Sequence, residues 1–159
     1  MRLRLIVGLW IALVAAAHAQ TTYPSKPVRF IVPYAAGGSV DPLTRLFTVR
    51  LTESLNQPMI VDLRPGGNTV IGSELVAKAA PDGHTLLVTH NAIAINQSLY
   101  PKLPYDTVRD FTQVAFIGVT TFTLVVNPAL PVKTVRDLID LAKAKKGELD
   151  FGTASTGGS

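Results

Sequence analysis

The stretch VRFIVPYAAGGSVD, residues 28–41, decides the fold and carries the sharpest functional signal of the chain. Its first five residues are mostly apolar and rich in β-branched side chains, which is typical of a buried parallel strand. A proline ends this strand, and Gly37 and Gly38 follow in a turn. The turn leads into a helix that we expect to begin near Asp41, with Pro42 at its first position. This order of strand, turn and helix predicts a βα unit.

The same alternation continues along the chain. Residues 59–63 and 85–89 read as two more strands, and a helix over about residues 69–80 lies between them. The turn signal Pro81-Asp82-Gly83 separates that helix from the last strand. Strands and helices that alternate in this way predict an α/β fold with right-handed βαβ units and a mostly parallel sheet.

The apolar residues of the two helices predict which faces pack on the sheet. Residues at helical spacing share one face, and Arg45, Thr48, Thr52 and Glu53 fall largely opposite the apolar face of the first helix. The residues expected on the sheet-facing sides are Leu43, Leu46, Phe47, Leu51 and Leu55 in the first helix, and Ile71, Leu75 and Ala79 in the second.

The second half of the chain has a different pattern. Residues 114–118 and 122–126 read as strands with no long helix between them, which is where a chain can cross from one lobe to another. Thr134 and Asp137 have the spacing of a capping box, with Asp in place of the usual Glu, and predict a helix start. Residues 149–151 read as a further strand that leads into a second glycine-rich stretch.

The first residues are predicted to be a cleavable export signal. Arg2 and Arg4 give a basic start, residues 5–17 are apolar, and Ala17-His18-Ala19 fits a small-x-small cleavage pattern. The apolar part is short for a membrane span, and no cysteine follows it to carry a lipid anchor. We therefore expect residues 1–19 to be removed, and a periplasmic protein that begins at Gln20.

Composition argues against several classes of function. The chain has 15 Lys and Arg against 11 Asp and Glu, so loss of the two arginines in the signal leaves a net charge of 13 − 11 = +2. These charges are interspersed and form no basic stripe, so nucleic acid is not an expected partner. The absence of cysteine excludes disulfides and thiolate chemistry. Two remaining histidines without suitably spaced carboxylates predict neither a metal nor another cofactor.

The first glycine-rich turn, residues 33–41, is the main candidate binding site. Backbone N–H groups at Gly37 and Gly38, the hydroxyl of Ser39 and the dipole of the following helix can together hold a carboxylate. No Lys or Arg lies in the turn. Asp41 either caps the helix or meets donor groups of the ligand. The alternative is an ordinary tight connection between a strand and a helix.

Four further side chains are candidates for a catalytic or binding role. The second glycine-rich stretch, residues 152–159, nearly matches a nucleophile elbow around Ser155, but the spacing is off by one. His84 follows a turn and is expected to be exposed, and His90 lacks a clear partner, so a Ser–His pair is weakly supported. Asn91 follows the third strand, where it can contact a ligand or cap a loop.

Seven stretches, in this order and spacing, resemble one family, although no single motif is decisive. They are residues 23–28, 33–41, 64–68, 80–83, 95–100, 103–106 and 130–135. Together they resemble the Bug (TctC-type) receptors, the periplasmic solute-binding proteins of tripartite tricarboxylate transporters. The resemblance covers nearly the whole chain after the signal. One local departure is Ile93, where many members have a histidine.

The resemblance implies a periplasmic binding protein-like fold of the two-lobed, type II Venus-flytrap kind, here truncated. Residues 20–120 would form part of the first lobe and residues 121–159 the start of the second. It implies a monomer without catalytic activity that binds a small carboxylate and delivers it to membrane subunits of a transporter. The implied ligand contacts are Tyr34, Ala35, Ala36, Gly37, Gly38, Ser39 and Asp41 in the first turn, and Thr153, Ala154, Ser155, Thr156 and Gly157 in the second. A serine hydrolase-like fragment and a non-functional truncated product are the alternatives.

Overall fold

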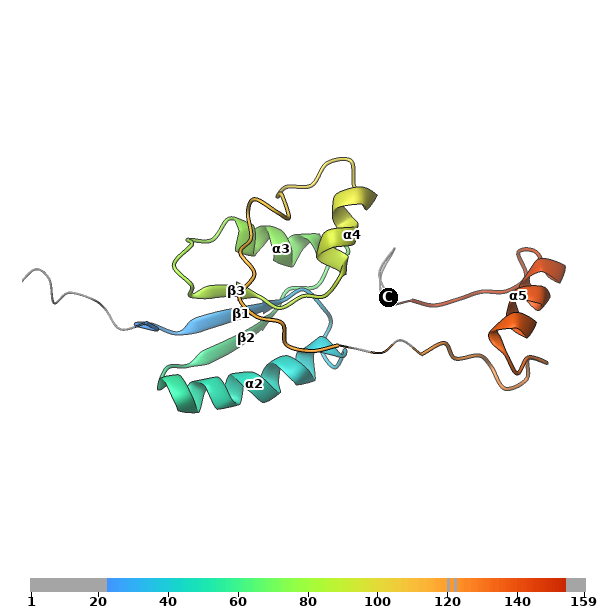
Figure 1. Ribbon diagram of the computed structural model, residues 1–159, viewed down its shortest axis with the longest axis horizontal. Helices are drawn as coiled ribbons and strands as arrows, with labels where there is room; N and C mark the ends of the chain where they lie inside the picture. Colours follow the sequence, from blue (N-terminus) through green and yellow to red (C-terminus); the bar gives the residue numbers. More distant parts are fainter. Residues whose placement is uncertain (1–22, 120, 122, 154–159) are drawn as a thin grey trace, which may run out of the picture.

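The computed structural model describes residues 23–119, 121 and 123–153. Three parallel strands form a sheet in the order β2-β1-β3 (Figure 1). The elements are β1 (Val28–Val32), α2 (Val40–Leu55), β2 (Met59–Leu63), α3 (Val70–Ala77), β3 (Thr85–Leu87), α4 (Ala92–Leu99) and α5 (Val135–Ala144). The expected α/β alternation and parallel sheet are confirmed.

The central strand is the most buried part of the molecule. Figure 1 shows α2 on one face of the sheet and α3 on the other. Right-handed crossovers require this, because the connection from β1 to β2 and the connection from β2 back to β3 run in opposite directions across the sheet. Phe30 of β1 pairs in register with Val61 of β2 and Leu86 of β3. Its ring meets Phe47 of α2 edge to face, with centroids 5.5 Å apart. The core therefore lies between α2 and one face of the sheet.

The predicted packing face of α2 is partly wrong. Thr44 and Thr48 are buried, whereas Leu46 is 69% exposed. The two threonines can be buried because their hydroxyls donate to backbone oxygens of their own helix, Thr44 to Val40 at 2.7 Å and Thr48 to Arg45 at 3.1 Å. Phe47 and Leu51 do pack against the core, as expected.

The predicted packing face of α3 is also wrong in part. Ile71 is 54% exposed, and Ser73 is fully buried. A Cβ atom on Gly72 would lie 2.8 Å from the Cβ atom of Pro33. The helix therefore approaches the end of β1 through its smallest residues, which is a contact that hydrophobic spacing alone does not reveal.

Three expected strands are not present in the described part of the chain. Residues 114–118 and 149–151 lie outside any strand, and so do residues 123–126 of the second run. An isolated strand gains no ladder hydrogen bonds, and the described residues offer these segments no partner strand. Strand β3 is also shorter than expected: it ends at Leu87, and the chain leaves the sheet after Val88 donates its N–H to the Ile31 carbonyl at 2.9 Å.

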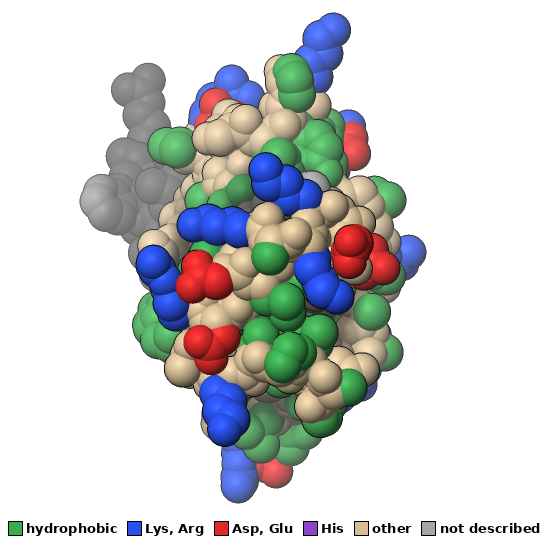
Figure 2. Space-filling view, turned by 90° about the vertical axis from the view of Figure 1, so that its right-hand side faces the viewer, with side chains coloured by type: hydrophobic (Ala, Val, Ile, Leu, Met, Phe, Trp, Pro, Cys, Tyr) green, Lys and Arg blue, Asp and Glu red, His purple; other side chains and the backbone are tan. Residues whose placement is uncertain are grey.

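The capping box of α5 is confirmed. Asp137 donates its N–H to Thr134 Oγ1 at 3.1 Å, and its carboxylate accepts the N–H of Thr134 at 2.9 Å. Figure 1 shows α5 apart from the sheet. Figure 2 shows apolar side chains at the surface of one face of the molecule, among basic and acidic ones. Within the residues that the structure describes, no helix is long and apolar enough to cross a membrane.

Candidate functional site

The carboxyl ends of the three strands meet at one edge of the sheet, where parallel α/β proteins bind ligands. The first glycine-rich turn follows β1, residues 64–69 follow β2, and Val88 to Asn91 follow β3. We call this edge, with these three connections, the ligand edge. Of the predicted site residues, this edge brings together Asn91 and the turn from Tyr34 to Asp41.

The first glycine-rich turn contains a tight reverse turn. Gly38 donates its N–H to the Ala35 carbonyl at 3.4 Å. Gly37 has a φ of +79° and occupies the third position of this turn, where a type II turn needs a positive φ and hence glycine. Residues 35–39 are exposed. The turn is therefore shaped by Gly37 and is open to a ligand.

Asp41 belongs to the turn and is bound within it. Its Oδ2 accepts the N–H of Gly37 at 3.0 Å, and its Oδ1 accepts Nε of Arg45 at 2.7 Å. The Gly37 N–H, with help from Arg45, holds the pKa of the Asp41 carboxyl below its usual range. Asp41 is therefore an ionised anchor between the turn and α2. It is not the N-cap residue of α2, a position that Ser39 holds.

The amino end of α2 faces the ligand edge without a side-chain cap. Ser39 is the N-cap residue, but its hydroxyl makes no capping hydrogen bond. The first N–H groups of a helix have no partner inside the helix, and the helix dipole places partial positive charge beside them. With Asp41 engaged by Gly37 and Arg45, these groups are the best-placed donors for an anion.

Tyr34 joins the turn to the end of β3. The backbone N–H of His90 donates to the Tyr34 hydroxyl at 3.3 Å, and that hydroxyl lies 3.0 Å from Thr89 Oγ1. Either hydroxyl can be the donor in the contact between Tyr34 and Thr89, because each can both donate and accept. Burial raises the pKa of Tyr34, against the lowering effect of these hydrogen bonds, so the hydroxyl stays protonated.

The imidazole of His90 lies against the ring of Tyr34. The ring centroids are 4.5 Å apart and the planes are 24° from parallel. Nδ1 of His90 lies 2.8 Å from Oδ1 of Asn91, and Asn91 is the exposed N-cap residue of α4. The sequence placed both residues at the strand end, but the stack on Tyr34 depends on the pairing of β1 with β3.

A buried polar cluster beside the ligand edge has no counterpart in the sequence prediction. Asn96 of α4 is fully buried. Its Nδ2 donates to the Asn68 carbonyl at 2.7 Å and to Thr69 Oγ1 at 3.2 Å, and its Oδ1 accepts Nδ2 of Asn68 at 2.7 Å. Asn68 and Thr69 both have positive φ angles. The cluster therefore fixes a strained connection between β2 and α3. The adjacent Asn and Thr residues before a helix were the one feature of the sequence that could have indicated this cluster.

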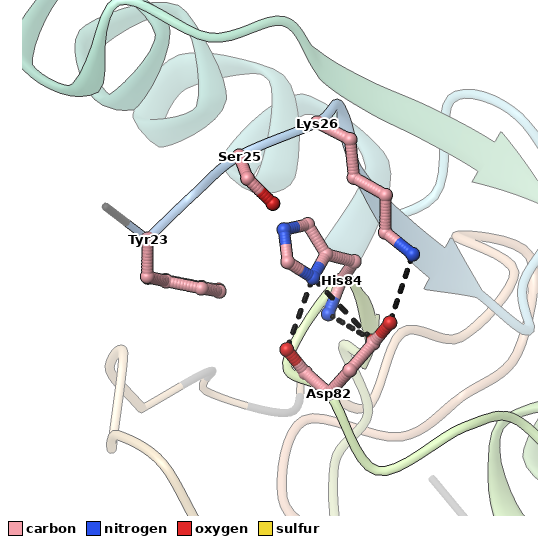
Figure 3. Close-up of a pocket in the computed structure, with 5 residues that line it drawn as sticks. All are labelled: Tyr23, Ser25, Lys26, Asp82 and His84. Carbon is pink, nitrogen blue, oxygen red and sulfur yellow. Dashed lines mark hydrogen bonds and ion pairs between the residues drawn. The ribbon is translucent and has the colours of Figure 1, made fainter. Parts of the chain in front are cut away.

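His84 lies at the opposite end of the sheet and is not exposed as expected. It precedes β3, and its side chain is only 10% exposed because the ring packs edge to face on Tyr23, with centroids 5.1 Å apart. It lines a pocket of about 300 Å³ together with Tyr23, Ser25, Lys26 and Asp82. Figure 3 shows these five residues. His84 and His90 therefore do not share a site.

The second glycine-rich stretch is described only at its start. Thr153 is exposed, while Ala154, Ser155, Thr156 and Gly157 lie outside the described residues. Ile93, the local departure from the family pattern, lies in the first turn of α4 and is partly buried. In the described ranges, no three His, Asp or Glu side chains are grouped as metal ligands would be.

Comparison with known proteins identifies the family. The model of the tripartite tricarboxylate transporter family receptors, TctC, matches residues 43–159. Protein BugT of Bordetella pertussis is 38% identical over 160 residues, which cover 98% of this chain and 49% of BugT. The chain thus spans about half the length of this relative.

Two similar solved structures are of proteins with a carboxylic acid, adipate in one and bound malate in the other. Rpa4515 of R. palustris with adipate has a TM-score of 0.68 and 31% identity, over 85% of this chain and 46% of that one. MatC of Rhodopseudomonas palustris with bound malate has a TM-score of 0.57 and 38% identity, over 60% of this chain and 33% of that one. The family match and these likenesses, together with the parallel sheet, show that the chain belongs to the TctC family of tripartite tricarboxylate transporter receptors.

Proposed function

We propose that this chain is part of an extracytoplasmic receptor that captures a small carboxylate for a tripartite tricarboxylate transporter. The observation that carries the proposal is the open turn before α2, where uncapped N–H groups at a helix start meet the ligand edge. Such a start attracts a carboxylate through hydrogen bonds and the helix dipole. Adipate and malate in the two structural relatives support this choice of ligand class.

The ligand carboxylate would lie against the backbone between Tyr34 and Ser39. Asp41 would hold the turn in shape through Gly37 and would not itself contact the ligand. Residues 153–157 of the second glycine-rich stretch would approach from the other lobe. Residues 20–120 would form the amino-terminal part of the first lobe, and the second lobe would begin at residue 121. Binding between two lobes needs no catalytic group, so we propose no enzymatic activity.

Calorimetry with adipate and malate tests this function. In the full-length receptor that carries this chain, Gly37→Val would force a branched side chain into a positive φ and distort the turn. Loss of two N–H contacts at about 1 kcal/mol each would weaken binding by over tenfold. Gly118→Val is the matched control, because a Cβ atom there meets no atom within 4 Å and no positive φ is required. Equal affinities in both variants and the native protein would count against a carboxylate site at this turn.

Export is a separate part of the proposal. Residues 1–19 would direct the chain to the periplasm, where the membrane subunits of the transporter are accessible to a monomeric receptor. N-terminal sequencing of the protein recovered from the periplasm should begin at Gln20. A retained Met1 in a soluble product would contradict cleavage.

A further inference from the structure

A second pocket lies at the amino end of the sheet, away from the ligand edge. Its volume is about 300 Å³, and its walls come from two segments, residues 23–26 before β1 and residues 82–84 before β3. Pockets that bind small molecules begin at about this size. The ligand edge lies at the opposite ends of the same strands. This pocket is therefore a separate site, and the proposed function does not account for it.

His84 supplies a buried acceptor to this pocket. Its Nδ1 lies 3.0 Å from the backbone carbonyl oxygen of Asp82, which can only accept, so the proton of the neutral ring is on Nδ1. Nε2 then carries a lone pair and points away from Asp82, toward Ser25 (Figure 3). The side chain is only 10% exposed, and Nε2 has no hydrogen-bond partner among the residues that the structure describes. A ligand that donates a hydrogen bond would satisfy this acceptor.

The charged groups of the pocket cancel each other. Lys26 Nζ lies 2.8 Å from Asp82 Oδ2, so the pair gives no net charge that would select an anion or a cation. The ammonium has further N–H groups, and each carboxylate oxygen can accept more than one hydrogen bond. The pair can therefore still donate to a neutral ligand and accept from it. A carboxylate fits less well, because it only accepts and leaves Nε2 of His84 without a donor.

Tyr23 forms a fixed apolar wall of the pocket. Its hydroxyl donates to the Gly83 carbonyl at 2.7 Å, and its ring packs edge to face on His84. Gly83 has a φ of +78°, and a Cβ atom there would lie 3.0 Å from Cε2 of Tyr23. Glycine therefore lets the ring lie close to the turn. Tyr23 is 56% exposed, so part of its surface is free to contact the carbon atoms of a ligand.

We infer that this pocket is an accessory binding site for a small neutral polyol of about the size of a monosaccharide. One hydroxyl donates to Nε2 of His84, other hydroxyls bond to Lys26 and Asp82, and the carbon skeleton lies on Tyr23. Hydroxyl groups suit these partners because each can both donate and accept. Ser25 is exposed, so its side chain can change rotamer and admit the hydroxyl to Nε2. The inference does not depend on the proposed carboxylate function.

Nuclear magnetic resonance of the native full-length receptor with glucose tests the site without a variant. Glucose should cause saturable shifts of the Nε2 resonance of His84 and of the backbone amides of Ser25 and Gly83. Fully O-methylated glucose keeps the ring and its oxygens but has no hydroxyl donor, and it should cause no saturable shift. Adipate should leave Nε2 unchanged, because its carboxylates only accept. Absence of shifts with glucose, or equal shifts with the methylated sugar, would overturn the inference.

The variant His84→Phe tests the acceptor itself, since it keeps a ring against Tyr23 and removes Nε2. Glucose affinity should fall by about fivefold, as expected for the loss of one hydrogen bond, and adipate affinity should not change. His90→Phe, which removes an imidazole outside the pocket, should bind glucose as the native protein does. Equal glucose affinity in His84→Phe and the native protein would overturn the inference and leave the receptor function intact. Glucose binding without adipate binding would support the inference and contradict the proposed function.

Discussion

The carboxylate of Asp41 accepts the backbone N–H of Gly37 at 3.0 Å, across the turn that precedes α2. Gly37 therefore already has an anionic partner inside the protein. A ligand carboxylate at this turn would use the neighbouring donors, or would compete with Asp41 for this one. The bond makes Asp41 the residue that holds the turn against its helix.

Removal of this carboxylate should loosen the turn. In Asp41→Ala, hydrogen exchange of the Gly37 amide should accelerate by roughly tenfold, because local opening no longer breaks a hydrogen bond. Arg45→Met is the control: it removes the other partner of Asp41 and leaves the bond to Gly37 in place. Equal exchange rates in native protein and Asp41→Ala would contradict the anchoring role.

The buried amide of Asn96 should be important for stability. Asn96→Leu keeps a similar volume but removes three hydrogen bonds to Asn68 and Thr69. We expect a loss of roughly 3 kcal/mol in the free energy of unfolding, since buried polar groups lose their partners. Urea denaturation measures this loss. Ser98→Ala, at an exposed position of the same helix, should change the unfolding free energy little, and a similar small change in Asn96→Leu would refute the prediction.

The order of strands and helices could be predicted from the sequence because it depends on local pattern. The five apolar residues of β1 and the glycines after it identify a βα unit without knowledge of any distant contact. The faces of α2 and α3 that pack on the sheet were less predictable, because they depend on contacts between individual side chains. Thr48 is buried because its hydroxyl bonds within the helix, and Gly72 is buried because Pro33 lies against it.

In the candidate site too, local features could be predicted from the sequence and long-range contacts could not. Tyr34 and Asn91 were placed at strand ends from the sequence, and the structure brings both to the ligand edge. The stack of His90 on Tyr34 joins residues 56 positions apart, and the Asn96 cluster joins residues 28 positions apart. Such contacts depend on strand pairing and helix docking, which hydrophobic periodicity does not specify.

Acid should weaken one specific ion pair at the amino end of the sheet. Lys26 Nζ, 2.8 Å from Asp82 Oδ2, and the N–H of His84 lower the pKa of Asp82 to about 2. The unfolded value is about 3.9. Because the folded pKa is the lower one, this contribution to stability is complete above about pH 5 and is lost as pH falls from about 4 through 2.

The matching measurement is urea unfolding of native protein and Asp82→Asn from pH 6 to pH 2. The native protein should be the more stable at pH 6, and the difference should shrink toward zero at pH 2. Glu53→Gln removes an exposed partner of Arg50 and should have little effect across this range. A difference for Asp82→Asn that is independent of pH would show that the ion pair is not its cause.

The exposed apolar side chains within residues 114–119 and 123–126 should govern the behaviour of residues 20–159 in isolation. Phe116 is 75% exposed and Val125 is 80% exposed, and β2 and β3 are the edge strands of the described sheet. Uncovered apolar segments and open strand edges promote association between molecules. We expect this piece to aggregate, or to melt over a broad range without cooperativity, and to bind carboxylates weakly or not at all.

Light scattering and thermal unfolding test this expectation. Phe116→Ser combined with Val125→Ser should lower the scattering, because the segment that associates becomes polar. Leu46→Ser is the control, since Leu46 is 69% exposed on α2, outside that segment, and it should leave the scattering nearly unchanged. A sharp thermal transition that moves upward with a millimolar dicarboxylate would show instead that residues 20–159 fold and bind alone. Such binding would place every essential ligand contact within these residues.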